Sequence, residues 1–198
     1  MKKLLILLAL WFTTISANAS LITIDIEDKA YGINDSLTAN IYISELEDSL
    51  GIQALVSGFT FDFSFQESLL NFERVMFGSN IDVDPTLPSF RTDAYISGQP
   101  FTVAETSFAF FSDLDLAQSG LNRFLLASVD FTVLGNGLAN FALNNANAFD
   151  NFALPHSVVD TRGASVQLGN QVSVPEPSSM AIFALAMMLL VSRKLRRS

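Results

Sequence analysis

The segment from Gly58 to Gln66 constrains the fold more than any other part of the chain. Phenylalanine occupies every odd position from 59 to 65, and the positions between them carry Thr60, Asp62 and Ser64. An alternation of period two places the four rings on one face of a β-strand, whereas a helix would scatter them around its axis. The segment is therefore predicted to be a half-buried strand whose aromatic face points into a core.

Three further runs alternate in the same way, at residues 22–26, 37–43 and 125–133. In the last run one face is expected to carry Leu125, Ala127, Val129, Phe131 and Val133. Short strands separated by Gly, Asn and Asp turns about every 8–12 residues predict an all-β sandwich or barrel. The polar run Asn144-Asn145-Ala146-Asn147 is expected to be a loop, and no helix is expected between the two ends of the chain.

The first 19 residues have the three parts of a secretory signal peptide. A basic start at Lys2 and Lys3 is followed by an apolar run and by the small residues Ala17 and Ala19. Cleavage by signal peptidase is expected before Ser20, so the chain is predicted to be exported. A buried N-terminal helix is the alternative interpretation.

The C-terminal end carries a second targeting pattern. A linker at 170–179 leads into a predicted transmembrane helix at 180–192 and a basic cytoplasmic tail at 193–198. The positive charges that hold this tail in the cytoplasm are Arg193, Lys194, Arg196 and Arg197. The apolar run from Met180 to Val191 would form about 18 Å of helix, against a hydrocarbon core of about 30 Å. Such a short segment suits a transient hold during processing.

Val174, Pro175, Glu176 and Pro177, followed by an apolar helix and a basic end, resemble the PEP-CTERM sorting signal, also known as the ice-binding protein C-terminal domain. The resemblance implies recognition by an exosortase and cleavage near the motif. It also implies passage from the inner membrane to the cell surface or extracellular matrix of a biofilm-forming Gram-negative bacterium. An ordinary tail anchor is the alternative. The chain has no regular Thr-x-Thr ladder, so no ice-binding face is expected.

The segment between the two targeting signals is strongly acidic and lacks cysteine. Of the 20 Asp and Glu and 11 Lys and Arg in the chain, all acids but Glu176 and only five bases lie there, which leaves a net charge of −14. A polyanionic surface repels phosphate backbones, so nucleic acid is excluded as a partner. Without cysteine, the domain depends on its apolar core for stability, and thiol catalysis is excluded.

Residues 20–169 are expected to form one domain, and three stretches of it resemble a cohesin. They are 61–72, 120–131 with the Gly135-Asn136-Gly137 turn, and 30–37. The corner at 65–68 departs from the family, because it lacks the usual Tyr, Asp and Pro. The resemblance implies a jelly-roll β-sandwich of about nine strands, and it does not carry dockerin binding over to this chain. Cohesins are similar in structure to carbohydrate-binding modules, so sugar binding is a candidate function of this domain by analogy alone.

Several polar residues are candidates for chemistry. Two acidic pairs offer hard oxygen ligands for Ca²⁺, although without the spacing of an EF-hand; they are Asp82 with Asp84 and Asp113 with Asp115. His156, the single histidine, has no triad motif beside it. Three tyrosines could stack on sugar rings, namely Tyr31, Tyr42 and Tyr95.

No residue pattern indicates a nucleophile, a phosphate loop or a metal-dependent enzyme. The chain is therefore predicted to be a non-catalytic structural or adhesive module that binds polysaccharide or another exported protein, with no required cofactor. The alternative is a polysaccharide-processing enzyme of the glycoside hydrolase type, for which any two of the many carboxylates could be nominated.

Overall fold

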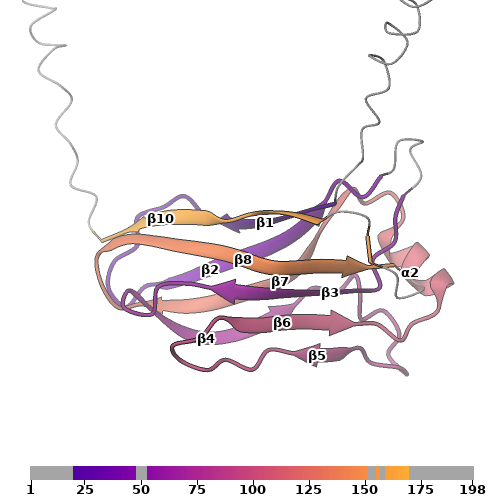
Figure 1. Cartoon of the computed structure of the whole chain (residues 1–198), viewed down its shortest axis with the longest axis horizontal. Helices are drawn as coiled ribbons and strands as arrows, with labels where there is room; N and C mark the ends of the chain where they lie inside the picture. Colours follow the sequence, from indigo (N-terminus) through magenta and orange to yellow (C-terminus); the bar gives the residue numbers. More distant parts are fainter. Residues whose placement is uncertain (1–19, 48–52, 151–154, 157–158, 170–198) are drawn as a thin grey trace, which may run out of the picture.

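The computed structural model describes residues 20–47, 53–150, 155–156 and 159–169, and within them two five-stranded sheets pack face to face (Figure 1). The first sheet has the order β4-β7-β2-β1-β9 and the second sheet the order β10-β8-β3-β6-β5. The strands are β1 (Ser20–Ile26), β2 (Ser36–Ser44), β3 (Gly58–Ser64), β4 (Leu70–Phe77), β5 (Phe90–Thr92), β6 (Phe101–Thr106), β7 (Arg123–Val133), β8 (Gly137–Phe149), β9 (Val159–Arg162) and β10 (Ala164–Leu168). The predicted all-β sandwich is confirmed, with ten strands described.

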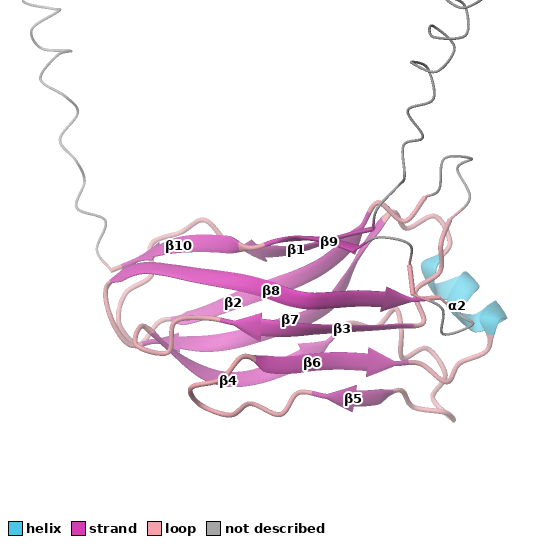
Figure 2. Cartoon of the chain, in the orientation of Figure 1, coloured by secondary structure: helices cyan, strands magenta, loops and turns pink. Residues whose placement is uncertain are grey.

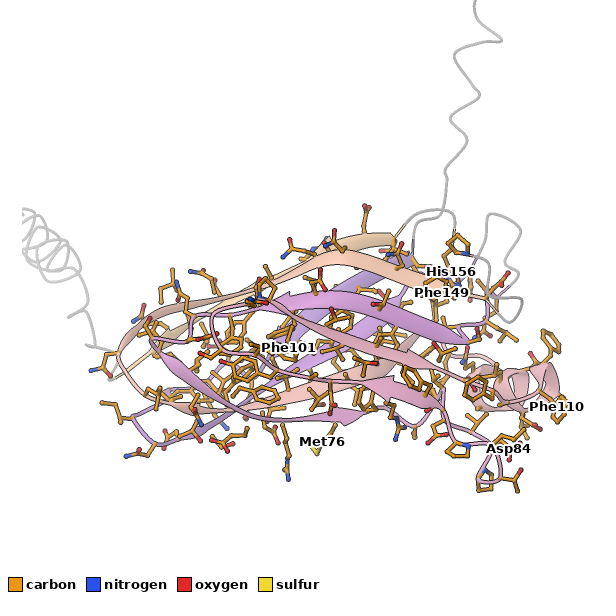
Figure 3. All side chains as sticks on the ribbon, turned by 60° about the horizontal axis from the view of Figure 1, so that its bottom comes forward. Met76, Asp84, Phe101, Phe110, Phe149 and His156 are labelled. Carbon is orange, nitrogen blue, oxygen red and sulfur yellow. The ribbon has the colours of Figure 1, made fainter. Side chains whose placement is uncertain are left out.

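The aromatic stripe of β3 lies between the sheets, as its alternation predicts. Phe59, Phe61 and Phe63 are fully buried, and the intervening Thr60 and Asp62 face outward. The rings pack on aromatic side chains from the facing sheet, and Phe101 of β6 lies in the same cluster (Figure 3). Each buried ring contributes about 1.5–3 kcal/mol of transfer free energy, which suits a domain that has no disulfide.

A β-bulge between β2 and β7 changes one prediction. Ile41 pairs with Ala127 but Tyr42 pairs with Leu125, so β7 carries one extra residue at this point. A bulge reverses the inside–outside alternation beyond it. As a result Leu126 is buried and Leu125 is only half-buried, so the prediction that Leu125 shares the inner face is wrong.

The polar run at 144–147 is not a loop, because it lies inside β8 and pairs with β3. The register is irregular there, because Thr60 and Asp62 are two residues apart on β3 but pair with Asn147 and Asn144, which are three residues apart on β8. Asn145 accommodates the irregularity with φ of 50°, a left-handed conformation that asparagine tolerates better than most residues. Small polar residues are typical of turns, but here they form the outer surface of a long strand.

One short helix was not expected from the sequence. Helix α2 (Phe111–Gln118) connects the two sheets at one end of the sandwich (Figure 2). Its apolar residues do not form a stripe toward the core, since Leu116 points to solvent while Leu114 and Gln118 are buried. The helix is held instead by hydrogen bonds between the Gln118 side chain and the backbone of Val56.

The two ends of the sandwich differ in what they carry. Helix α2 lies at the end where β8 finishes, next to the start of β3. The last described strand ends at the opposite end, where Leu168 pairs with Gly137 at the start of β8 (Figure 1). The last described residue, Gly169, therefore lies at the end opposite α2.

Candidate binding surface

The outer face of the first sheet uses most of its polar groups internally. Asp130 accepts hydrogen bonds from Thr38 Oγ1 at 2.7 Å and from Arg74 Nε at 2.8 Å. The Ser128 hydroxyl donates to the amide oxygen of Asn40 at 2.7 Å. Asp130 and Ser128 are consequently buried although they lie on an outer face. Groups that are both buried and already paired offer little to a partner.

The rest of this face is covered in the same way. The guanidinium of Arg123 lies 3.8 Å from the centroid of the Tyr42 ring and 3.3 Å from Asp25. Thr132 donates a hydrogen bond of 2.8 Å to the Glu73 carboxylate. These contacts leave a self-contained polar surface on the first sheet.

The outer face of the second sheet, called the binding face below, is different. Strand pairing places small outward side chains in rows across β10, β8, β3, β6 and β5. Six of these described side chains make no hydrogen bond within the described part of the chain: Thr60, Thr92, Thr106, Asn140, Asn144 and Ser165. Hydroxyl and amide groups that already face water can exchange it for a partner at little cost.

A single carboxylate lies in the middle of the binding face. Asp62 accepts 2.7 Å hydrogen bonds from the Asn145 amide and from the Thr102 hydroxyl. These bonds lower the pKa of the Asp62 carboxyl, with the bond from Asn145 the larger cause. The face therefore carries a fixed negative charge at neutral pH.

Exposed apolar side chains gather at the α2 end of this face and are called the end patch. Its members are Phe90, Phe108, Phe110, Phe111 and Leu116, which are between 55% and 83% exposed. Phe90 pairs with Thr106 and so belongs to the outermost row of the binding face, and Figure 3 shows Phe110 at the extreme end of the molecule. Large exposed apolar patches are typical of protein–protein or membrane contact sites and of ligand grooves, and aromatic residues are enriched at protein–protein interfaces.

The end of the chain matches one known family model. Residues 173–197 match the model described as "PEP-CTERM protein-sorting motif". The tail carries a PEP-CTERM sorting motif. It implies an exported protein that is held at the membrane and then sorted to the surface.

Solved cohesin structures share the architecture of the described domain. A type II cohesin domain from the cellulosome of Acetivibrio cellulolyticus has a TM-score of 0.58 at 14% identity, covering 75% of this chain and 95% of that chain. The type II cohesin dyad of the ScaA scaffoldin from the same organism has a TM-score of 0.60 at 13% identity, and the match covers 79% of this chain and 50% of that chain. A type I cohesin–dockerin complex from Clostridium thermocellum has a TM-score of 0.53 at 10% identity, and the match covers 76% of this chain and 94% of that chain. The domain has a cohesin fold. No curated protein shows significant sequence similarity to the chain.

Of the two acidic pairs predicted to bind calcium, the pair Asp82 and Asp84 already accepts hydrogen bonds from other residues of the domain. Asp82 accepts a hydrogen bond from the Ser89 amide and forms a 3.2 Å ion pair with Arg91, while Asp84 accepts from Thr86. The other two carboxylates are Asp113 and Asp115 on helix α2. The described residues hold no group of three or more metal-binding side chains, and calcium binding stays a prediction.

The second sheet also contains a buried acid that the sequence did not indicate. Glu105 of β6 is 1% exposed and receives bonds from Ser89 and Arg91 on one oxygen, Oε1. Its other oxygen, Oε2, has no hydrogen-bond partner in the described part of the chain. Burial raises the pKa of Glu105, and the bonds from Ser89 and Arg91 oppose that rise.

The remaining candidates do not come together as a catalytic or sugar-binding site. His156 Nδ1 lies 2.8 Å from Ser20 Oγ, but its Nε2 faces the carbonyl of Leu55 at 3.2 Å and no carboxylate. The three tyrosines are separated, because Tyr31 is buried, Tyr42 lies under Arg123 and Tyr95 packs on Phe72.

The sorting residues lie outside the described part of the chain. They are Ala17 and Ala19, Val174, Pro175, Glu176 and Pro177, and Arg193, Lys194, Arg196 and Arg197. The predicted transmembrane helix at 180–192 also lies outside it, and among the described residues no helix has the length and apolar character needed to cross a membrane. Ser20, the expected first residue after cleavage, is described and begins β1.

Proposed function

We propose that this chain is an exosortase-sorted surface protein of a Gram-negative bacterium whose cohesin-like domain binds another exported protein and catalyses no reaction. The observation that carries the proposal is the contrast between the two outer faces. The first sheet pairs most of its polar groups internally, whereas the binding face keeps six hydroxyl and amide side chains free of hydrogen bonds within the described part of the chain.

The composition of the binding face suits a protein partner. A typical interface forms about ten direct hydrogen bonds and depends on a few aromatic anchors. The free side chains supply the first requirement, and the end patch supplies the second beside the same face. Sugar-binding platforms rely on exposed aromatic rings that stack on the sugar, whereas the centre of the binding face is built of Thr, Asn, Ser and Ala around the Asp62 carboxylate.

The described domain ends just after Leu168, which pairs with Gly137, and the end patch lies at the opposite end of the sandwich. Cohesin–dockerin binding is a property of the solved complexes, and here it serves as the model for a protein-binding sandwich.

Site-specific photo-crosslinking in the cells that produce the protein tests this proposal. A benzophenone amino acid replaces Asn144 on the binding face, and in a matched variant it replaces Met76, an exposed residue on the outer side of β4 (Figure 3). We expect a discrete protein adduct from position 144 and none from position 76. Equal adducts from both positions, or adducts containing only polysaccharide, would contradict the proposal.

The enzymatic alternative has its own test. Purified full-length protein is incubated with the exopolysaccharide of the same cells, and reducing ends are followed over time. We expect no release above the level given by heat-denatured protein. A time-dependent release that disappears when one carboxylate is replaced by its amide would assign the protein to the glycoside hydrolases instead.

A further inference from the structure

A small cavity lies at the end of the binding face that is opposite the end patch. It has a volume of about 320 Å³ and is lined by Ser64, Phe65, Glu67, Gly98, Gln99 and Pro100. Ser64 is the last residue of β3, and residues 98–100 immediately precede β6, so the cavity continues the face along these two paired strands. We call it the Glu67 pocket. Its volume is at the small end of the range for ligand pockets, roughly 300–1,000 Å³.

The carboxylate in this pocket is held in a defined orientation. Ser97 Oγ donates to Glu67 Oε2 at 2.7 Å, and the Gly98 amide donates to Oε1 at 2.6 Å. Gly98 adopts φ of 83°, a conformation that glycine reaches without strain. The two bonds lower the pKa of the Glu67 carboxyl, the bond from Ser97 being the larger cause. The group is therefore ionised at neutral pH.

One wall of the pocket is an immobilised aromatic ring. The centroid of Phe65 lies 4.7 Å from that of Phe131 and 5.8 Å from that of Tyr95, so the ring is packed on the core. A fixed ring beside a carboxylate favours a cation with an apolar stem, because the stem packs on the ring and the charge meets the acid.

No positive charge of the described domain neutralises Glu67. The described ion pairs join Lys29 to Glu27, Arg74 to Asp130, Arg91 to Asp82 and Glu105, and Arg123 to Asp25. The pocket thus keeps an unneutralised negative charge within a strongly acidic domain. Long-range attraction of a basic partner adds to the local contact.

We propose that the Glu67 pocket receives a lysine or arginine side chain of the partner protein, which makes a basic residue a requirement for binding. This inference rests on the proposed protein-binding function and adds the chemistry of one contact to it. The partner side chain enters beside Ser64, lays its methylene groups on Phe65 and places its charge on the Glu67 carboxylate. The neighbouring Asp62 on the same face strengthens the attraction.

Selective ¹⁵N-glycine labelling of the full chain in detergent micelles tests the pocket directly. The chain has 10 glycines, so the spectrum is sparse, and the Gly98 amide donates to Glu67 itself. The probes are the N-acetyl methylamides of lysine and arginine. Their controls are the corresponding norleucine derivative, which lacks the charge, and N-acetylglucosamine. We expect a saturable shift of the Gly98 signal with the two basic probes only.

Two amide variants separate the pocket from carboxylates in general. Glu67→Gln keeps the side-chain shape and removes the charge, so probe affinity should fall on the order of tenfold. Glu73→Gln is the matched control, because Glu73 is also an exposed carboxylate held by hydroxyl and amide donors, but it lies on the first sheet. This control should bind the probes as the unmodified chain does.

The outcomes distinguish this inference from the proposed function. An equal Gly98 shift with norleucine or N-acetylglucosamine, or unchanged affinity in Glu67→Gln, would overturn the basic-side-chain assignment. The photo-crosslink from position 144 provides a second readout, and its yield should fall several-fold in Glu67→Gln and persist in Glu73→Gln. A protein adduct formed with the same yield in the unmodified chain and in Glu67→Gln would overturn the pocket inference and leave the protein-binding proposal standing.

Discussion

Adjacent side chains in β3 have opposite environments. Phe61 is 0% exposed and lies between the sheets, whereas Asp62 faces solvent and is bonded only to Thr102 and Asn145. A buried ring loses both transfer free energy and packing contacts when it is truncated. A partly exposed carboxylate loses much less, because water replaces its partners.

Replacing these two neighbours in turn measures that contrast. Phe61→Ala should lower the free energy of unfolding by about 3–5 kcal/mol because it leaves a cavity between the sheets. Asp62→Ala should cost less than about 1 kcal/mol, as is usual for surface substitutions. Urea denaturation of both variants provides the measurement. Similar losses at the two positions would show that the alternation is not a buried–exposed pattern.

Glu105 gives the stability of the domain a pH dependence of known sign. Burial raises its pKa in the folded state above the ordinary value of 4.5, so the native state keeps the proton longer than the unfolded chain. Its contribution is fully present below that value and is lost as the pH rises through the folded pKa. As the pH rises from about 4 to about 7, the free energy of unfolding of the unmodified chain should therefore fall relative to that of Glu105→Gln.

The matched control for this experiment is Glu73→Gln. Hydrogen bonds from Thr132 and then Asn71 lower the pKa of the Glu73 carboxyl, so its contribution is present above its ordinary pKa and is lost as the pH falls. Over the pH range in which the Glu105→Gln difference changes, the Glu73→Gln difference should therefore stay constant, and it should change only as the pH falls below the ordinary value of 4.5. Parallel trends would contradict the assigned burial of Glu105.

Helix α2 shows how a short element is fixed by polar contacts when its apolar pattern is weak. Gln118 donates to the carbonyls of Val56 at 2.7 Å and Asn80 at 2.9 Å, and it accepts from the Val56 amide. The Asn80 side chain donates in return to the carbonyl of Ala117. These bonds tie the helix to the loops that precede β3 and follow β4, so the end patch is held on a fixed support.

Removal of that one side chain should release the helix. Gln118→Ala leaves the buried amide and carbonyl of Val56 without partners, and each unsatisfied group costs about 1–3 kcal/mol. We expect a loss of roughly 2–4 kcal/mol in denaturant unfolding and faster hydrogen exchange at α2. Gln167→Ala, at an exposed position of β10, is the control and should be nearly neutral. A neutral Gln118→Ala would show that apolar contacts of Leu114 hold the helix.

The molecule as a whole combines a sandwich with a C-terminal sorting motif and a predicted N-terminal signal peptide. β1 begins at Ser20, where the signal peptide is expected to be cleaved, and it pairs with β2 and β9. The Ser20 hydroxyl also contacts His156. The expected first residue of the mature chain is therefore already part of the sheet.

Mass spectrometry of the protein isolated from the cell envelope should show the loss of both terminal segments. The mature chain should begin at Ser20, and it should end near Pro175-Glu176-Pro177 in cells that contain an exosortase. Cells without the exosortase are the control and should retain the C-terminal segment. Recovery of a chain ending at Ser198 from exosortase-positive cells would refute the processing step and leave export intact.

Much of the fold followed from local order in the chain. The Phe59 to Phe65 alternation indicated one buried strand face, the turn residues between similar runs indicated a sandwich or barrel, and the resemblance to cohesins favoured the sandwich. The C-terminal sorting motif could be recognised for the same reason, because it is defined by consecutive residues. Predictions from neighbouring residues were wrong at two places. At Leu125 a bulge reverses the alternation, and at 144–147 residues typical of turns form the surface of a strand.

The candidate binding surface depended on pairing between distant residues. Thr38 and Thr60 are both outward threonines on strands, but only Thr38 meets a carboxylate from another strand, Asp130. The Glu67 pocket likewise joins residues 64–67 to residues 98–100. Alternation along a strand sets which side chains face outward, since it is a property of neighbours in sequence. Which of those side chains stays free is set by strand register, and register exists only once the two sheets have formed.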